Sequence, residues 1–260
     1  IRVANAPLLV DLYSSDAGLT PTQWQKAQFP VEYQEKIRVI HEGVRTETYQ
    51  PALGVKLVLP EIGLDLSHVD ELVTYVGRGM ESYRGFPQFM QALARVLRER
   101  PKAQAVIVGP DRIAYGGPKA PNGKTYKEWA LSELDLDLSR VHFTGLLPRY
   151  QYRQVLQASS VHVYLTIPFV LSWSMLEAMS CGCLLVASNT QPVQEVIAHN
   201  QNGLLVDFFD HQALASQICD ALENQSSYAP LRANARKTIE EKYSWRKTVP
   251  ETIAYLQSLL

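Results

Sequence analysis

Residues 160–195 constrain the fold of this chain more than any other stretch, because they predict a complete β-α-β unit. The run VHVYLT at residues 161–166 is apolar and rich in β-branched and aromatic residues, which predicts a strand buried on both faces. Pro168 is expected to end that strand. Residues 174–180 predict a helix, and LLVAS at residues 184–188 predicts the next strand, parallel to the first.

Local signals mark both ends of this predicted helix. Ser174 and Glu177 stand in the S-x-x-E relation of a capping box, which predicts a helix that begins near Ser174. Cys181 and Gly182 are expected to end it, since glycine accepts the left-handed conformation that follows many helices. The helix N-terminus would face the turn of residues 168–173, where its free N–H groups and partial positive charge suit a phosphate or carboxylate.

The sequence PFVLSWSMLEAMSCGCLLVAS, followed by PVQEVI, resembles the nucleotide-sugar-binding half of family-4 glycosyltransferases, which have the GT-B fold. That family places one Glu eight residues before the Glu of LEAM. Here the second Glu is Glu177, and the first position holds Phe169. The resemblance implies that Glu177 binds the ribose and that a turn donates backbone N–H groups to the diphosphate and sugar. In this chain the turn consists of Phe169, Val170, Leu171, Ser172 and Trp173.

Some of these residues also have plainer interpretations, which the sequence leaves open. Glu177 could serve only the capping box, and Ser172 and Ser174 could cap the helix rather than donate to phosphate. Trp173 fits a wall or core residue better than a stacking platform. Phe169 cannot accept hydrogen bonds from a sugar, as the family's first Glu does, so another group or the backbone would have to hold the donor sugar.

Strand-like and helix-like segments alternate from residue 71 onward. This pattern predicts an α/β fold with a doubly wound parallel sheet, Rossmann-like and equivalent to one half of a GT-B fold. We assign residues 53–260 to a nucleotide-sugar donor-binding domain with C-terminal helices. By the same resemblance, residues 1–52 are the remnant of an N-terminal acceptor-side domain and a linker. They predict a strand-like run, a helix from near Thr22 and a second strand within residues 36–44.

The first predicted strand end carries a turn with two arginines. Gly77, Arg78 and Gly79 follow the strand, and Arg84 precedes the next helix in the position where the family has a Lys. Glycines allow close backbone approach, and arginines can form paired hydrogen bonds with a diphosphate. The alternative of a dinucleotide fingerprint fails on spacing, because its third glycine would fall on Ser82. A surface turn with two solvated arginines remains open.

Two further turns follow the next predicted strands. Gly109 ends one of them, and Thr144, Gly145 and Leu146 end the other, with Tyr150 beyond. The resemblance implies that the backbone near residues 144–146 meets the edge of the nucleobase. An ordinary strand-to-helix turn explains each single side chain equally well, and Tyr150 could instead pack its helix against the sheet.

Composition excludes several classes of function. The net charge of −1 gives no general attraction for nucleic acid, and no apolar run reaches the roughly 18 residues that span a bilayer. The three cysteines are too few for a disulfide framework, which favours a reducing cytosol. We therefore expect a cytoplasmic protein, with peripheral attachment to the inner face of a membrane left open. No cluster of carboxylates, histidines and cysteines predicts a metal site.

Together, the residues and the resemblance imply a retaining glycosyltransferase that takes its sugar from a nucleotide-sugar, with UDP-linked donors such as UDP-glucose expected. The acceptor would be a saccharide or lipid-linked molecule in polysaccharide or glycoconjugate synthesis. Arg78 and Arg84 would stabilise the departing diphosphate, so no metal or other cofactor is expected. Residues 1–260 alone are expected to bind donor without transferring it, because the N-terminal domain is missing. The alternatives are a non-catalytic nucleotide-binding module of the same fold and an NAD-linked oxidoreductase.

Overall fold

A six-stranded parallel sheet forms the centre of the computed structural model, which describes residues 2–52 and 54–260. Its strands are β5 (Leu72–Val76), β6 (Gln104–Val108), β7 (Val141–Gly145), β8 (Val161–Tyr164), β9 (Leu185–Ser188) and β10 (Leu204–Val206). Their spatial order is β10-β9-β8-β5-β6-β7, and every neighbouring pair is parallel. The chain order reverses between β5 and β8, and ligands of open α/β sheets bind at such switch points. The predicted α/β fold with a parallel sheet is confirmed.

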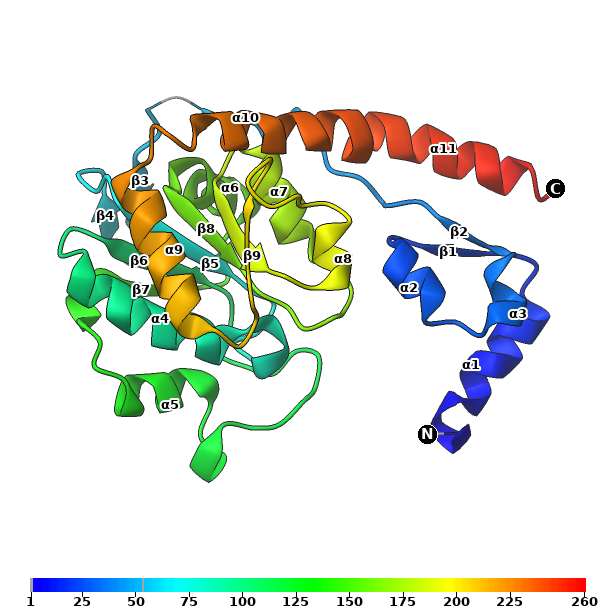
Figure 1. Ribbon diagram of the computed structural model, residues 1–260, viewed down its shortest axis with the longest axis horizontal. Coiled ribbons are helices and arrows are strands. Elements are labelled where there is room, and N and C mark those ends of the chain that lie inside the picture. The colour runs from blue at the N-terminus through cyan, green and yellow to red at the C-terminus, as the bar shows by residue number, and fades with distance from the viewer. Residues whose placement is uncertain (1, 53) are drawn as a thin grey trace.

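Helices cover both faces of the sheet (Figure 1). One face carries α4 (Phe86–Glu99), α5 (Tyr126–Glu133) and α9 (His211–Glu223). The other carries α6 (Arg149–Ala158), α7 (Trp173–Ser180), α8 (Gln191–Gln194) and α10 (Ala229–Thr238). Aromatic rings fill the first layer: Tyr75 stacks on Phe89 with 4.8 Å between ring centroids, and both are buried. Burial of each such side chain contributes about 1.5–3 kcal/mol to stability.

Strand β8 is shorter than the sequence predicts. It ends at Tyr164, four residues before Pro168, so the proline is not what terminates it. The N–H of Thr166 donates instead to the Ser188 hydroxyl at 3.0 Å. This side-chain contact replaces the next backbone hydrogen bond that β8 would make with β9. The turn toward α7 therefore begins inside the predicted strand.

The N-terminal segment forms a small β-α-β unit beside the main sheet. It consists of α1 (Arg2–Ser14), β1 (Gly18–Thr20), α2 (Gln23–Ala27), α3 (Val31–Gln34) and β2 (Ile37–Val39). Strands β1 and β2 are parallel, and Thr22 caps α2, as predicted. The apolar run at residues 8–10 lies in a helix, whereas the strand follows at residues 18–20. A three-residue apolar run carries no period, so it fits a helix as well as a strand.

The carboxylate of Glu195, just after α8, joins this segment to the main body. Its two oxygens accept hydrogen bonds from the N–H groups of Gln23 at 2.8 Å and Trp24 at 2.6 Å. These N–H groups belong to the first turn of α2, where a helix has no carbonyl partners of its own. A side chain of the main body thus caps a helix of the N-terminal segment.

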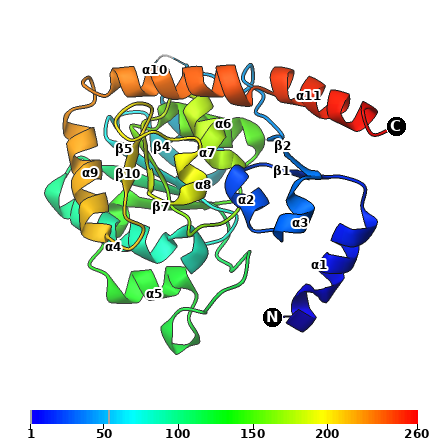
Figure 2. The same ribbon diagram turned by 45° about the vertical axis from the view of Figure 1, so that its right-hand side comes forward.

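The chain crosses between the two parts twice. After β2 it enters the main body through Val44 and an antiparallel hairpin of β3 (Leu57–Leu59) and β4 (Leu64–Leu66). At its end it returns through α11 (Trp245–Gln257), which passes over β1 and β2 in both views (Figures 1 and 2). The crossings touch, because Val44 N–H donates to the Tyr243 carbonyl at 2.7 Å and Trp245 N–H donates to the Val44 carbonyl at 3.0 Å.

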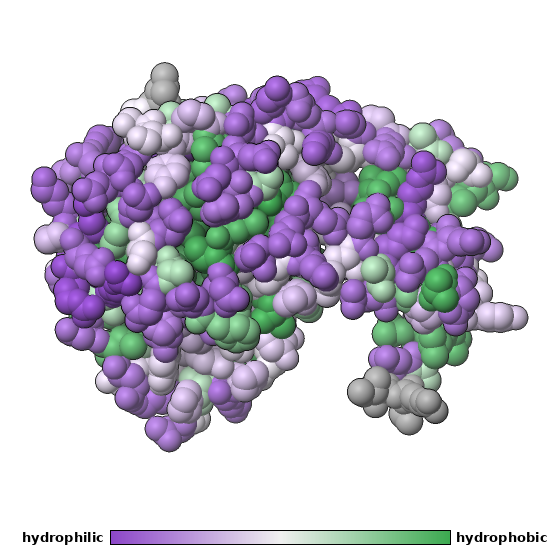
Figure 3. All heavy atoms as spheres, in the orientation of Figure 1, coloured by the Kyte–Doolittle hydropathy of each residue, from purple (hydrophilic) through white to green (hydrophobic). Residues whose placement is uncertain are grey.

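The surface seen in Figure 3 is largely hydrophilic, with one broad hydrophobic area in the middle of the main body. Smaller hydrophobic areas lie near α1 and at the end of α11, and Val10 and Leu256 of these helices are more than half exposed. None of the helices in the described residues combines the length and the apolar character needed to cross a bilayer.

Candidate functional site

The turns after β5, β6 and β7 lie in direct backbone contact at the carboxyl edge of the sheet. Gly77 N–H donates to the Val108 carbonyl at 3.0 Å, and Gly109 N–H donates to the Gly145 carbonyl at 2.9 Å. Gly109 has φ +135°, and a Cβ there would lie 2.1 Å from the Gly77 carbonyl oxygen. The structure therefore brings the three predicted turns together, and glycine is required at Gly109 by the packing of one turn against the next.

Arg84 connects the first turn to the fourth across the switch point. Its guanidinium donates to the Tyr164 hydroxyl at 3.1 Å, to the Thr166 hydroxyl at 2.9 Å and to the Val170 carbonyl at 2.9 Å. The side chain is only 5% exposed. Three of its five N–H groups are thus engaged by neutral acceptors.

Phe169 occupies the position that the resemblance assigns to a carboxylate, and it covers Arg84. The guanidinium carbon lies 5.2 Å from the Phe169 ring centroid and 4.9 Å from that of Tyr115, on the long loop before α5. The two rings meet edge-on at 5.3 Å. Ring faces attract cations, so the aromatic pair compensates part of the buried charge.

Glu81 anchors the loop that carries Tyr115, and sequence reasoning missed it. Its Oε2 accepts hydrogen bonds from the N–H groups of Ala114 and Tyr115, both at 3.0 Å, and the residue is fully buried. The only signal in the sequence is an acidic residue inside a turn that also holds Arg78 and Arg84. Its partners lie 33 and 34 residues away, so no local pattern identifies them.

Helix α7 begins one residue earlier than predicted, and its cap is different. Ser172 is the N-cap residue, and its hydroxyl accepts the hydrogen bond of Ser174 N–H at 3.3 Å. The capping box of Ser174 and Glu177 is wrong, because Ser174 lies inside the helix. Ser172 N–H donates to the Tyr164 hydroxyl at 2.9 Å, so that donor of the turn is already engaged. The predicted helix end at Cys181 and Gly182 is confirmed, with Gly182 at φ +76°.

The carboxylate of Glu177 is bound by a tyrosine rather than by the helix end. The Tyr152 hydroxyl donates to Glu177 Oε2 at 2.6 Å. Burial raises the pKa of Glu177 above its usual range, while the hydrogen bond from Tyr152, the nearby Tyr49 hydroxyl and the charge of Arg149 act to lower it. These four side chains and Trp173 line a cavity of about 470 Å³.

The remaining predicted residues differ in exposure. Arg78 is exposed, as are Leu146 at 77%, Trp173 at 57% and Val170 at 40%. Leu171 is buried, and Gly79 packs against the Arg112 carbonyl. The Thr144 hydroxyl donates to the Gly145 carbonyl at 3.1 Å, and the Tyr150 hydroxyl donates to Glu61 at 2.7 Å. The Tyr150 hydroxyl therefore joins α6 to the turn between β3 and β4 by a hydrogen bond.

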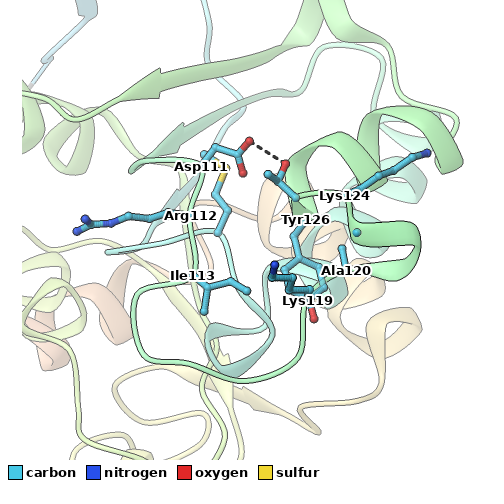
Figure 4. Close-up of a pocket in the computed structure, with 10 residues that line it drawn as sticks. Asp111, Arg112, Ile113, Lys119, Ala120, Lys124 and Tyr126 are labelled. Atoms are coloured by element: carbon cyan, nitrogen blue, oxygen red, sulfur yellow. Dashed lines mark hydrogen bonds between the residues drawn. The ribbon is translucent and has the colours of Figure 1, made fainter.

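A second, smaller cavity of about 290 Å³ lies at the loop before α5 (Figure 4). Lys119 and Tyr126 line it, and Asp111 accepts a hydrogen bond from the Thr125 hydroxyl at 2.8 Å. None of its lining residues belongs to the predicted set. Within residues 2–52 and 54–260, no group of three or more His, Cys, Asp or Glu side chains is placed to hold a metal ion.

Comparisons with known proteins agree with this architecture. The family model described as glycosyl transferases group 1 matches residues 64–238, and the model described as glycosyl transferase family 4 group matches residues 1–49. The chain is 27% identical over 235 residues to alpha-maltose-1-phosphate synthase of Mycolicibacterium smegmatis, covering 86% of this chain and 57% of that protein. It is 25% identical over 229 residues to D-inositol 3-phosphate glycosyltransferase of Segniliparus rotundus, covering 87% and 48%. The chain thus spans about half the length of these curated relatives.

Solved structures show the same fold at lower identity. HepE of Anabaena in complex with UDP-glucose superposes with a TM-score of 0.81 at 21% identity, covering all of this chain and 69% of that one. The C-terminal domain of the group 1 glycosyl transferase LpcC of Francisella tularensis superposes with a TM-score of 0.61 at 18% identity, covering 78% and 99%. Because the group 1 model matches well over half of the residues, the chain belongs to the group 1 glycosyltransferases, the family-4 type with a GT-B fold.

Proposed function

We propose that this protein binds a UDP-linked sugar and serves in its transfer, with retention of configuration, to a saccharide or lipid-linked acceptor. The observation that carries the proposal is the arrangement at the switch point: Arg84 donates to Tyr164 of β8 and to Val170 of the next turn, Arg78 is exposed on the turn after β5, and α7 begins just after Val170. Positive charge gathered at a switch point suits a diphosphate. Support for uracil comes from HepE, solved with UDP-glucose, UDP and glucose, or UDP.

Each part of the donor then has a named partner. Glu177 accepts hydrogen bonds from the ribose hydroxyls, and the backbone at residues 144–146 meets the base. Arg78, Arg84 and the α7 N-terminus bind the diphosphate. As the bond from the anomeric carbon to the diphosphate oxygen breaks, these groups stabilise the charge that develops on UDP, the role that a metal has in other enzymes.

The acceptor is expected to bind on the side of residues 1–52. In a GT-B enzyme the two substrates meet between two domains, and this chain spans only about half the length of its curated relatives. We propose that a complete acceptor-side domain, whose last unit is residues 1–52, positions the acceptor over the donor site. Residues 1–260 alone then bind donor without transferring its sugar.

Titration calorimetry tests the donor site directly. With EDTA present, UDP should bind more tightly than GDP or ADP, and NAD should bind weakly, because the site is built for one base and one diphosphate. Equal binding of all four ligands would contradict the assignment of the base. Binding that appears only after magnesium is added would contradict metal independence.

A non-catalytic nucleotide-binding module is the second candidate, and Phe169 is the observation that favours it. The aromatic pair of Phe169 and Tyr115 closes over Arg84 where the resemblance places a sugar-binding carboxylate. Under this alternative UDP and UDP-glucose bind equally well, because no group recognises the sugar. Tighter binding of UDP-glucose than of UDP excludes the alternative and supports a sugar-binding role for the turn.

A further inference from the structure

Two tyrosines from different parts of the chain converge on Glu177. Tyr152 lies on α6 and donates its hydroxyl to Glu177 Oε2 at 2.6 Å. Tyr49 lies between β2 and β3 and faces the same carboxylate, and its ring meets that of Tyr152 edge-on with 6.0 Å between centroids. Glu177 and both rings line the cavity of about 470 Å³.

Tyr49 is fixed to the main body although it lies in the segment that joins the two parts. Its backbone carbonyl accepts hydrogen bonds from the Ser180 hydroxyl and, at 2.7 Å, from the Arg236 guanidinium. The same guanidinium donates to the carbonyl of Ser180 at 2.8 Å and to that of Thr46 at 3.0 Å. Arg236 therefore locks this segment onto α7 and α10, and the Tyr49 ring stays beside Glu177.

We propose that Tyr152, supported by Tyr49, is a positioning residue that orients the Glu177 carboxylate to accept hydrogen bonds from the ribose of a nucleoside diphosphate. The inference rests on the proposed function, and it gives a role to Tyr152 and Tyr49, which have none in that proposal. An ionised carboxylate has about four acceptor positions, so the bond from Tyr152 leaves capacity for both ribose hydroxyls. Without that bond the side chain is free to rotate, and the ribose loses an oriented partner.

The same contacts set the pH dependence of binding. The charged or titratable groups that face Glu177 are Tyr49 from the joining segment, Arg149 and Tyr152 from α6, and Cys181 at the end of α7. Burial raises the pKa of Glu177, and Tyr152, Tyr49 and Arg149 lower it. Loss of the Tyr152 hydroxyl therefore raises this pKa further, and the ionised acceptor disappears at a higher pH than in the wild type.

Binding of UDP to Tyr152→Phe, Tyr49→Phe, Glu177→Gln and the double variant Tyr152→Phe/Glu177→Gln tests this inference. At about pH 8, Tyr152→Phe should bind UDP about tenfold more weakly than the wild type, because the variant loses a hydrogen bond to a charged group. The loss should grow at about pH 5.5, where the variant has less ionised Glu177 than the wild type. Dividing the dissociation constant of each variant by that of the wild type at the same pH removes the effect of the titration of UDP itself. Tyr49→Phe should show the same trend with a smaller loss.

The double variant separates positioning from a general effect on the fold. If Tyr152 acts through Glu177, its removal changes affinity by less than about twofold once Glu177 is already Gln. Tyr228→Phe is the matched control, since Tyr228 also donates its hydroxyl to a carboxylate, that of Asp220, far from this cavity. It should bind UDP like the wild type.

The outcomes distinguish this inference from the proposed function. Full additivity of the two substitutions, or a loss for Tyr152→Phe that is equal at both pH values, overturns the positioning role. Weak binding by Glu177→Gln together with wild-type binding by both tyrosine variants also overturns it and leaves the ribose role of Glu177 intact. Failure of the wild type to bind UDP overturns the proposed function and this inference together.

Discussion

Arg78 and Arg84 have opposite surroundings, although the sequence predicts one role for both. Arg84 is buried, hydrogen-bonded to three neutral acceptors and enclosed by the rings of Tyr115 and Phe169. Arg78 is exposed on the preceding turn. One arginine therefore contributes to the stability of the switch point as well as to its charge, and the other contributes charge alone.

Single substitutions should separate these contributions. Arg84→Ala removes the donor to the buried hydroxyls of Tyr164 and Thr166, at a cost of about 1–3 kcal/mol for each. We expect the midpoint of thermal unfolding to fall by at least about 4 °C, because each kcal/mol corresponds to about 2–4 °C in a domain of this size. Arg78→Ala should change it by less than about 1 °C and should still weaken UDP binding. Equal unfolding midpoints for the two variants would show that the buried hydrogen bonds do not stabilise the fold.

At the level of elements, one side chain of the main body binds the N-terminus of α2. Glu195 caps α2 by accepting hydrogen bonds from the N–H groups of Gln23 and Trp24. A carboxylate at a helix N-terminus is favourable because it satisfies unpaired donors and opposes the positive end of the helix dipole. The contact joins residues more than 170 positions apart.

Glu195→Ala should loosen α2 without unfolding the main sheet. Loss of a cap costs about 1 kcal/mol, which corresponds to roughly fivefold faster amide exchange at Gln23 and Trp24. Hydrogen exchange followed by mass spectrometry measures this, with the amides of β5 and β8 as the internal reference. Glu99→Ala, which removes the ion pair with Arg95 on α4, is the control and should leave α2 unchanged. Unaltered exchange in Glu195→Ala would mean that the cap does not hold the junction.

The elements and turns of the main body could be predicted from sequence because their signals are local. Alternating apolar runs, Gly182 after α7 and Gly109 after β6 each depend on a few neighbouring residues. The N-cap residue of α7 could not be predicted, because Ser172 and Ser174 both fit the pattern. Only the hydrogen bond from Tyr152 shows that the Glu177 carboxylate does not point back to the helix N-terminus.

Side chains that act across the fold could not be predicted from sequence. Glu81 and Glu195 bind N–H groups far along the chain, and neither belongs to a motif. The orientation of Arg84 also depends on residues of β8 and the following turn, 80 to 86 positions later. The residue types at the site were thus available from the sequence, whereas their hydrogen-bond partners required the fold.

At the level of the whole molecule, transfer should need more than these 260 residues. Correct placement of two reactants can account for about 7–11 kcal/mol of a barrier, and one half of a cleft places only the donor. We expect residues 1–260 to bind UDP-sugar and to release labelled sugar to water slowly, without forming a product with saccharide or lipid-linked acceptors. The comparison is a version extended N-terminally by a full domain, assayed with the same labelled donor. Equal transfer by the short chain would show that it already holds a complete active site.

The two chain crossings, at Val44 and at residues 243–245, restrict how the N-terminal segment can move relative to the main body. One chain segment between two bodies allows rotation about several axes, whereas two segments that are hydrogen-bonded to each other favour rotation about a single axis. The hydrogen bonds from Val44 to Tyr243 and from Trp245 to Val44 join the two segments at one point, which forms a bridge between them. We expect any opening between the N-terminal segment and the main body to be a rotation about that bridge, and to require that Glu195 release Gln23 and Trp24. Because α11 follows this bridge and its Tyr255 hydroxyl donates to the Lys36 carbonyl at 3.3 Å, just before β2, such a rotation should move β2 together with α11.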